Sequence, residues 1–94
     1  MIIVRNSFIA KPGQAGKLAA QLKNMGKAGN LRNVRVLTDL AVDFNHVIME
    51  HEVESLSELE QLMTRYSSDP KAREVAKGYI DPWATGRREL FRVV

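Results

Sequence analysis

The chain has 94 residues, of which 45% are hydrophobic and 27% charged, a composition typical of one small folded domain rather than a disordered segment. It contains no cysteine, which excludes disulfides and thiolate metal sites. The net charge of +3 comes from 14 basic and 11 acidic side chains that are interleaved, which favours a mixed solvated surface over a nucleic-acid-binding patch. We therefore expect a single domain covering residues 1–94 that does not bind nucleic acid.

Targeting and membrane signals are also missing from the pattern. Met1 leads directly into Ile2, Ile3 and Val4, with no basic segment before a long apolar run, so no signal peptide is expected. No apolar stretch approaches the length needed to cross a bilayer. These observations predict a cytoplasmic protein without membrane contact.

The first half of the chain predicts a strand, a helix and a strand. The segment Ile2–Ala10 is rich in Ile, Val and Phe and ends at the turn-forming pair Pro12-Gly13. Residues 14–27 predict a helix, because apolar residues recur on one stripe at Ala15, Leu18, Leu22 and Met25. Residues 34–40 predict a second strand, because their side chains alternate between two sets, Val34, Val36, Thr38 and Leu40 against Arg35, Leu37 and Asp39.

The second half predicts a hairpin, a divided helix and a last strand. Residues 43–45 connect the second strand to a third at 47–53. Ser55 and Glu58 have the spacing of a capping box, so a helix begins there and continues with apolar residues through Tyr66. Asp69-Pro70 interrupts it, and a second helical part follows over 72–79. Asp81-Pro82 and Gly86 end that part, and residues 89–94 close the chain as a strand.

The order of elements predicts an α+β, ferredoxin-like βαββαβ sandwich. The strands carry apolar side chains on both faces, as Ile2, Val4 and Phe8 on one side and Ile3 and Ile9 on the other show for the first strand. An open sheet with helices on one side is expected to be polar on its other side. The second face is therefore predicted to pair with a second copy of the chain, as a homodimer that forms a dimeric α/β barrel.

Several short segments resemble the dimeric α/β-barrel superfamily over nearly the whole chain. The opening, Arg5-Asn6-Ser7 followed by Lys11-Pro12-Gly13, is similar to antibiotic-biosynthesis monooxygenases and their haem-degrading relatives. The middle and C-terminal parts look most like NIPSNAP-type members, on four segments: Arg35-Val36-Leu37-Thr38-Asp39, Asp43-Phe44-Asn45, Glu52-Val53-Glu54-Ser55-Leu56 and Gly86-Arg87-Arg88-Glu89-Leu90. The resemblance implies the fold more strongly than any chemistry.

The haem-degrading relatives use an Asn on their first strand and a Trp and a His on their second helical region. Asn6 stands where that Asn would be, and Arg65 or Tyr66 stands where the Trp would be. Residues 71–79, where the axial His is expected, contain no histidine. The resemblance therefore implies a protein without a cofactor, in which Asn6 and Trp83 take the roles of the Asn and Trp of cofactor-free monooxygenases.

Asn6 and His51 are the polar residues placed best for chemistry. Asn6 shares strand parity with Ile2, Val4 and Phe8, so its amide is predicted to project into an apolar layer. Its partner there is a ligand carbonyl, or else protein backbone or water. His46 and His51 fall on opposite faces of the third strand, so they cannot bind one metal ion together, and His51 shares its face with apolar residues. It is a candidate base, or else a structural histidine at a dimer contact or beside a carboxylate.

The remaining candidates are aromatic and acidic. Tyr66, Tyr79 and Trp83 are predicted to cluster in the divided helical region, as walls of a ligand pocket or as core. Glu50, Glu52 and Glu54 alternate along one strand face, and a charged edge facing Arg35 or Arg88 is a simpler interpretation than a metal site. Phosphate-binding loops, nucleophile elbows and zinc spacings are absent from the sequence.

These observations support one leading hypothesis and one rival. The first is a homodimer that binds or oxidises a small apolar organic molecule in a pocket between helices and sheet. Asn6 would orient a carbonyl, His51 would act as a base, and Tyr66 and Trp83 would form walls. The rival is a non-catalytic NIPSNAP-like binding or protein-interaction module. Whether the protein is an enzyme stays open at this point.

Overall fold

The computed structural model describes residues 1–41, 44–78 and 81–94. Asp43, expected in the hairpin connection, and Tyr79, expected in the aromatic cluster, lie outside the described residues. The strands are β1 (Ile2–Ala10), β2 (Arg32–Thr38), β3 (His46–Val53) and β4 (Trp83–Arg92). The helices are α1 (Ala15–Ala28), α2 (Leu56–Ser68) and α3 (Pro70–Ala76).

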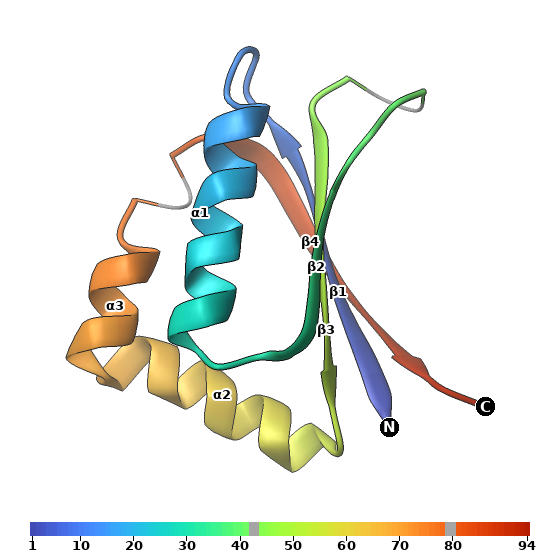
Figure 1. The fold of residues 1–94 in the computed structure, drawn as a ribbon, viewed down its shortest axis with the longest axis vertical. Coiled ribbons are helices and arrows are strands. Elements are labelled where there is room, and N and C mark those ends of the chain that lie inside the picture. Colours follow the sequence, from blue (N-terminus) through green and yellow to red (C-terminus); the bar gives the residue numbers. More distant parts are fainter. Residues whose placement is uncertain (42–43, 79–80) are drawn as a thin grey trace.

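The strands form one antiparallel sheet in the order β2-β3-β1-β4. All three helices lie on the same side of this sheet, and its other face is open (Figure 1). The α+β ferredoxin-like βαββαβ prediction is therefore confirmed. None of the helices in the described part of the chain is long and apolar enough to cross a membrane.

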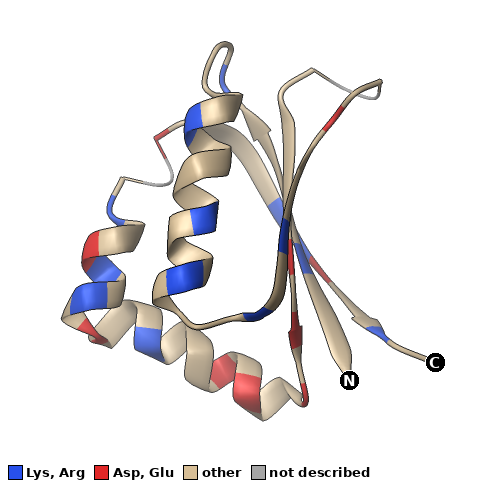
Figure 2. Ribbon diagram, in the orientation of Figure 1, with Lys and Arg blue, Asp and Glu red and all other residues tan. Residues whose placement is uncertain are grey.

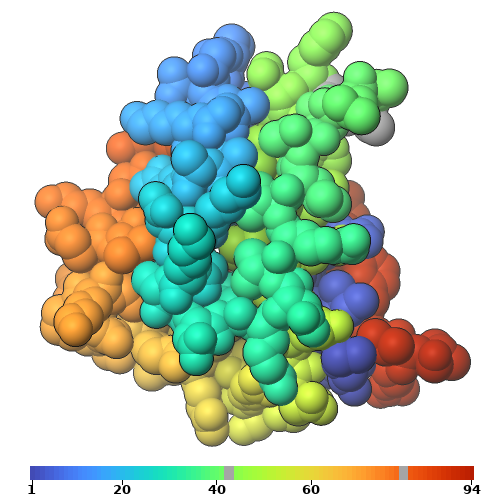
Figure 3. Space-filling model, viewed as in Figure 1, coloured from blue at the N-terminus to red at the C-terminus, as the bar shows by residue number. Residues whose placement is uncertain are grey.

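The core lies between the helices and the sheet, because alternate strand residues point toward the helices. Val4 and Val47 of the sheet and Leu18 of α1 are fully buried there. Figure 3 shows α1 in the middle of the helix side, between α3 and β2. A second group of buried residues, including Val53, Leu59 and Leu62, packs α2 against the end of the sheet near the N-terminus of β1.

The predicted start of α2 is confirmed in detail. Ser55 is the N-cap, and its hydroxyl accepts a hydrogen bond from the Glu58 backbone N–H at 3.2 Å. The Glu58 carboxylate reaches back to the Glu54 backbone N–H at 2.6 Å. The break before α3 follows the expected chemistry as well, since the Asp69 side chain accepts from the Lys71 N–H at 2.9 Å and Pro70 is the first helical residue.

The predicted last strand is wrong at its beginning. β4 starts at Trp83, so Trp83 belongs to the sheet and not to the divided helical region, and Gly86 lies inside the strand. The reason is local packing: a Cβ at Gly86 would come within 3.0 Å of the rings of Phe8 and Trp83. Glycine at this position leaves room for the aromatic pair and marks close packing in the strand.

The charges are distributed unevenly over the helices. Figure 2 shows that α1 carries basic residues, whereas α2 and α3 carry both acidic and basic residues. The basic residues of α1 are Lys17, Lys23 and Lys27, all exposed. Across the helix layer the surface is therefore mixed in sign.

Gly29 provides a stability test of the contact between α1 and α2. A Cβ at Gly29 would collide with the Tyr66 hydroxyl, which donates to the Met25 carbonyl at 2.5 Å. We expect Gly29→Ala to lower the free energy of unfolding by about 1–3 kcal/mol, because the hydrogen bond is lost. Gly16→Ala is the control: nothing lies near that position, and alanine favours the helix by up to about 1 kcal/mol. Urea denaturation measures both, and a Gly29→Ala variant as stable as the wild type would contradict the contact.

Candidate functional site

A cavity of about 290 Å³ lies between the helix layer and the sheet. Its wall comes from β1, β3 and β4 on one side and from all three helices on the other. The wall is mostly apolar and includes Phe8, Leu22, Met25, Met49, Leu59 and Leu62. Polar groups enter it from the sheet at Asn6, His51 and Arg88. An apolar cavity with a few converging polar groups is the usual form of a small-molecule site.

Asn6 projects toward the helices from β1, as its strand parity predicts, and it is 7% exposed. Its Oδ1 accepts a hydrogen bond from Arg88 Nε at 2.7 Å. The partner of the buried amide oxygen is therefore a guanidinium group from the neighbouring strand, where Arg88 is paired directly with Asn6. Among the described residues the Asn6 side chain has no other hydrogen-bond partner.

Sequence reasoning missed Arg88 as a cavity residue. The alternation of residues along the last strand assigns Arg88 to the helix side of the sheet. That assignment requires a strand that begins at Trp83, before the predicted start at residue 89. With β4 extended in this way, Gly86, Arg88 and Leu90 pair with Phe8, Asn6 and Val4 of β1. Arg88 then belongs to the helix side of the sheet.

His51 lies on β3, on the same face as Asn6, and it is 3% exposed. Its Nδ1 is buried and has no hydrogen-bond partner among the described residues. Burial lowers the pKa of His51 below 6.5, the positive charge of Arg88 lowers it further, and the Glu52 backbone and the Glu58 carboxylate act in the opposite direction. A neutral imidazole therefore faces the cavity at pH 7.

The lowered pKa of His51 predicts a loss of stability in mild acid. Between pH 7 and pH 5 the unfolded chain binds more protons at this residue than the folded chain, so the free energy of unfolding falls as the pH falls. We expect the wild type to lose more stability over this range than His51→Gln, whose side chain does not titrate. The midpoints of urea unfolding, measured at pH 7 and at pH 5 with the same protein concentration, test this prediction. Equal losses of stability in the two proteins would contradict it.

Tyr66 contributes its ring to the cavity wall from α2. Its hydroxyl is held by the Met25 carbonyl at the end of α1, and burial raises its pKa above 10.0. The hydroxyl therefore acts in the structure as a link between two helices. Asn6, His51 and Tyr66 are thus brought together around one cavity.

Trp83 is not in the wall of this cavity as the described residues define it. It packs against Phe8, with ring centroids 5.3 Å apart and an angle of 55° between the planes. Since Phe8 lines the cavity, Trp83 stands behind the wall and supports it. Its location in β4 places it away from the helical cluster predicted from the sequence.

The prediction that Glu50, Glu52 and Glu54 form a charged sheet edge is wrong, whereas the predicted contact with Arg35 is confirmed for Glu50. β3 is an inner strand, and Glu50 is 5% exposed between Arg35 Nη2 at 2.6 Å and Arg5 Nε at 2.7 Å. These hydrogen bonds, with that of Arg35 the largest cause, lower the pKa of Glu50 against the opposing effect of burial. Arg88 lies on the other face of the sheet. His46 is half-buried beside the connection to β2.

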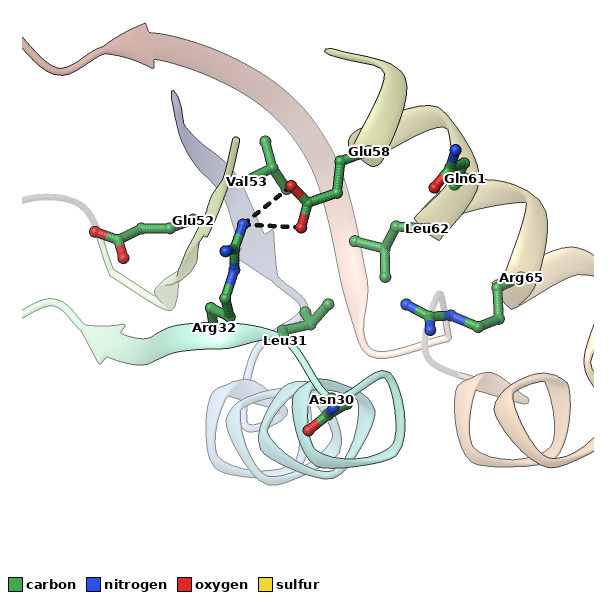
Figure 4. Close-up of a pocket in the computed structure, with 9 residues that line it drawn as sticks. All are labelled: Asn30, Leu31, Arg32, Glu52, Val53, Glu58, Gln61, Leu62 and Arg65. Atoms are coloured by element: carbon green, nitrogen blue, oxygen red, sulfur yellow. Dashed lines mark hydrogen bonds and ion pairs between the residues drawn. The ribbon is translucent and has the colours of Figure 1, made fainter. Parts of the chain in front are cut away.

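A second hollow, of about 360 Å³, lies where the end of α1 meets β2 and α2. Figure 4 shows that Arg32 reaches across it to Glu58, with hydrogen bonds of 2.9 and 3.0 Å. Leu31 and Leu62 line this hollow and the apolar cavity alike. Because the charges of Arg32 and Glu58 already neutralise each other, the apolar cavity is the better candidate for a ligand site.

The second helical region, 71–78 in the described part, offers no axial ligand for a haem group, because it contains no histidine. Within the described ranges no cluster of three or more His, Cys, Asp or Glu side chains could hold a metal ion. We assign no haem chemistry to the cavity.

Comparison with known proteins gives matches in structure. No protein-family model matches the sequence, and no curated protein matches it. An uncharacterised NIPSNAP domain protein from Burkholderia xenovorans superposes with a TM-score of 0.83 at 11% identity, covering 100% of this chain and 95% of that one. A NIPSNAP family protein from Agrobacterium tumefaciens gives 0.83 at 8% identity, over 99% and 92% of the two chains.

The resemblance to monooxygenases also has a structural counterpart. A structure of an antibiotic biosynthesis monooxygenase superposes with a TM-score of 0.73 at 13% identity, covering 100% of this chain and 99% of that one. Identities this low show a common fold and no common activity. The chain therefore has the fold seen in structures of NIPSNAP domain proteins and of an antibiotic biosynthesis monooxygenase.

Proposed function

We propose that the chain is a single domain that forms a cytoplasmic homodimer and binds a small apolar organic molecule in the cavity between its helices and its sheet. The observation that carries this proposal is the convergence of Asn6, His51 and Arg88 on one apolar cavity. A buried imidazole nitrogen without a partner is costly unless something binds it. A ligand oxygen or N–H group would satisfy it.

The open face of the sheet supports the homodimer. Its apolar side chains come from all four strands and are Ile3, Ile9, Leu37, Ile48 and Phe91. Glu50 lies among them, held between Arg5 and Arg35, and Arg5 also lies over the Phe91 ring at 5.0 Å. The Arg87–Glu89 ion pair lies on the same face. A face that combines apolar side chains with paired charges resembles an interface more than a solvated surface.

Methionine methyl groups offer a direct test of the cavity. Met25, Met49 and Met63 line it, whereas Met1 lies at the chain end and serves as an internal control. We expect 3-phenylpropan-1-ol, a small neutral apolar probe, to shift the NMR signals of the three cavity methyls and to leave Met1 unchanged. If none of the three shifts, or if Met1 shifts equally, small-molecule binding in this cavity is refuted and the interaction module becomes the better account.

A second candidate function is oxidation of the bound molecule by O₂ without a cofactor. The neutral His51, whose Nδ1 has no partner in the described part of the chain, favours it, because an unprotonated imidazole can accept a proton from an acidic ligand. Oxygen uptake with 1-naphthol as substrate tests this candidate. Uptake that is absent, or that is the same in His51→Gln, would leave binding without catalysis.

A further inference from the structure

Arg88 differs from the other paired arginines of the sheet in its partners. Arg5, Arg32, Arg35 and Arg87 each form an ion pair with a glutamate. Arg88 Nε donates to Asn6 Oδ1 at 2.7 Å, and its Nη1 contacts Met63 Sδ at 3.2 Å. Both acceptors are neutral, and among the described residues no carboxylate lies within ion-pair distance of Arg88. Its charge is held in place but is not neutralised.

Arg88 lies at the rim of the cavity. The residue is exposed overall and lines the cavity, so it stands at the rim, with Asn6 fixing its Nε. A guanidinium group has five N–H donors, so the bonds to Asn6 and Met63 leave others free. A ligand head group at the rim can accept hydrogen bonds from these N–H groups.

The rest of the cavity wall determines which kind of ligand body can be attached to that head group. Apolar side chains such as Phe8, Leu22 and Leu59 form most of the cavity, and at neutral pH His51 adds no second positive charge. An apolar body therefore fits inside. An anionic head group fits at the rim, where a charge-assisted hydrogen bond gains from the low dielectric of the cavity.

We propose that Arg88 binds the carboxylate of a small apolar organic acid, and that Asn6 is a positioning residue that orients the guanidinium group. This inference rests on the proposed function, which requires only that an apolar molecule enters the cavity. It adds to the expected role of Asn6: the amide oxygen accepts from Arg88, while the amide Nδ2 hydrogens are the donors that would orient a ligand carbonyl. The carboxylate is chosen because its two oxygens match the planar fork of an arginine.

A matched pair of probes isolates the contribution of the head group. We expect 3-phenylpropionate to bind the wild type about tenfold or more tightly than 3-phenylpropan-1-ol, measured by calorimetry at pH 7. Arg88→Gln is expected to remove this preference, because a neutral amide cannot pair with the charge of the carboxylate. Asn6→Ala is expected to reduce the preference in part, because the guanidinium remains but is no longer oriented.

Arg87→Gln is the control, since Arg87 is the next residue of the same strand, lies on the opposite face and pairs with Glu89. It should leave both affinities unchanged. If the alcohol binds but the acid binds no better, the role of Arg88 is refuted and the cavity proposal stands. If neither probe binds, both fail. If Arg88→Gln weakens the dimer and leaves acid binding intact, Arg88 serves a subunit contact, which also overturns the inference.

Discussion

Replacing Ile48 with glutamate should convert the proposed homodimer into monomers, with a rise of about 100-fold or more in its dissociation constant. Ile48 lies on the open face of β3 and is paired with Ser7 of β1 and Leu37 of β2, so it is near the middle of the sheet. A carboxylate there would be buried against a second sheet without a partner, at a cost of several kcal/mol. Sedimentation equilibrium at micromolar concentration measures the effect.

Leu56→Glu is the matched control for this variant. Leu56 is an exposed leucine at the start of α2, on the helix side of the molecule, and a negative charge in the first turn of a helix is favourable. It should remain as dimeric as the wild type. A dimeric Ile48→Glu protein would mean that the two copies do not pair through the open sheet face.

Replacing Ala76 with tryptophan should abolish binding of 3-phenylpropan-1-ol, with a loss of affinity of about 100-fold or more. Ala76 is the last residue of α3, is half-buried, and lines the cavity. An indole in place of its methyl group would occupy the space that the ligand needs. Overpacking costs about 1–3 kcal/mol of stability, so thermal unfolding should accompany the binding measurement.

Ala20→Trp carries the same substitution to an exposed position on α1. It adds the same ring to the surface and should leave probe binding unchanged. If the Ala76→Trp protein folds and still binds the probe with wild-type affinity, the ligand site is elsewhere.

The fold could be predicted from the sequence because its signals are local. Ser55 with Glu58 and Asp69 with Pro70 fix the ends of helices through hydrogen bonds within a few residues. The alternation of β1 placed Asn6 among buried residues, and the odd spacing of His46 and His51 placed them on opposite faces. The helix ends follow from capping motifs and the strand faces from periodicity, and both signals lie within a few residues of the chain.

The predictions that were wrong concern features that depend on contacts between residues far apart in the sequence. Gly86 was interpreted as a break because its aromatic neighbours, Phe8 and Trp83, are brought to it only by the pairing of β1 with β4. The same error hid Arg88, whose partner Asn6 is 82 residues away in the chain. The ion pairs of Glu50 were expected at an edge because the order of strands in the sheet cannot be deduced from one sequence.

Native mass spectrometry of freshly purified protein tests the central claim most directly. We expect a dimer that carries one small additional mass per chain, lost on denaturation, with the mass of an organic acid if Arg88 acts as proposed. Ala76→Trp purified in parallel should give a dimer without it. A bare wild-type dimer under gentle conditions, unable to take up either phenylpropyl probe, would contradict the ligand site, and a bare monomer would contradict the pairing of the two sheets as well.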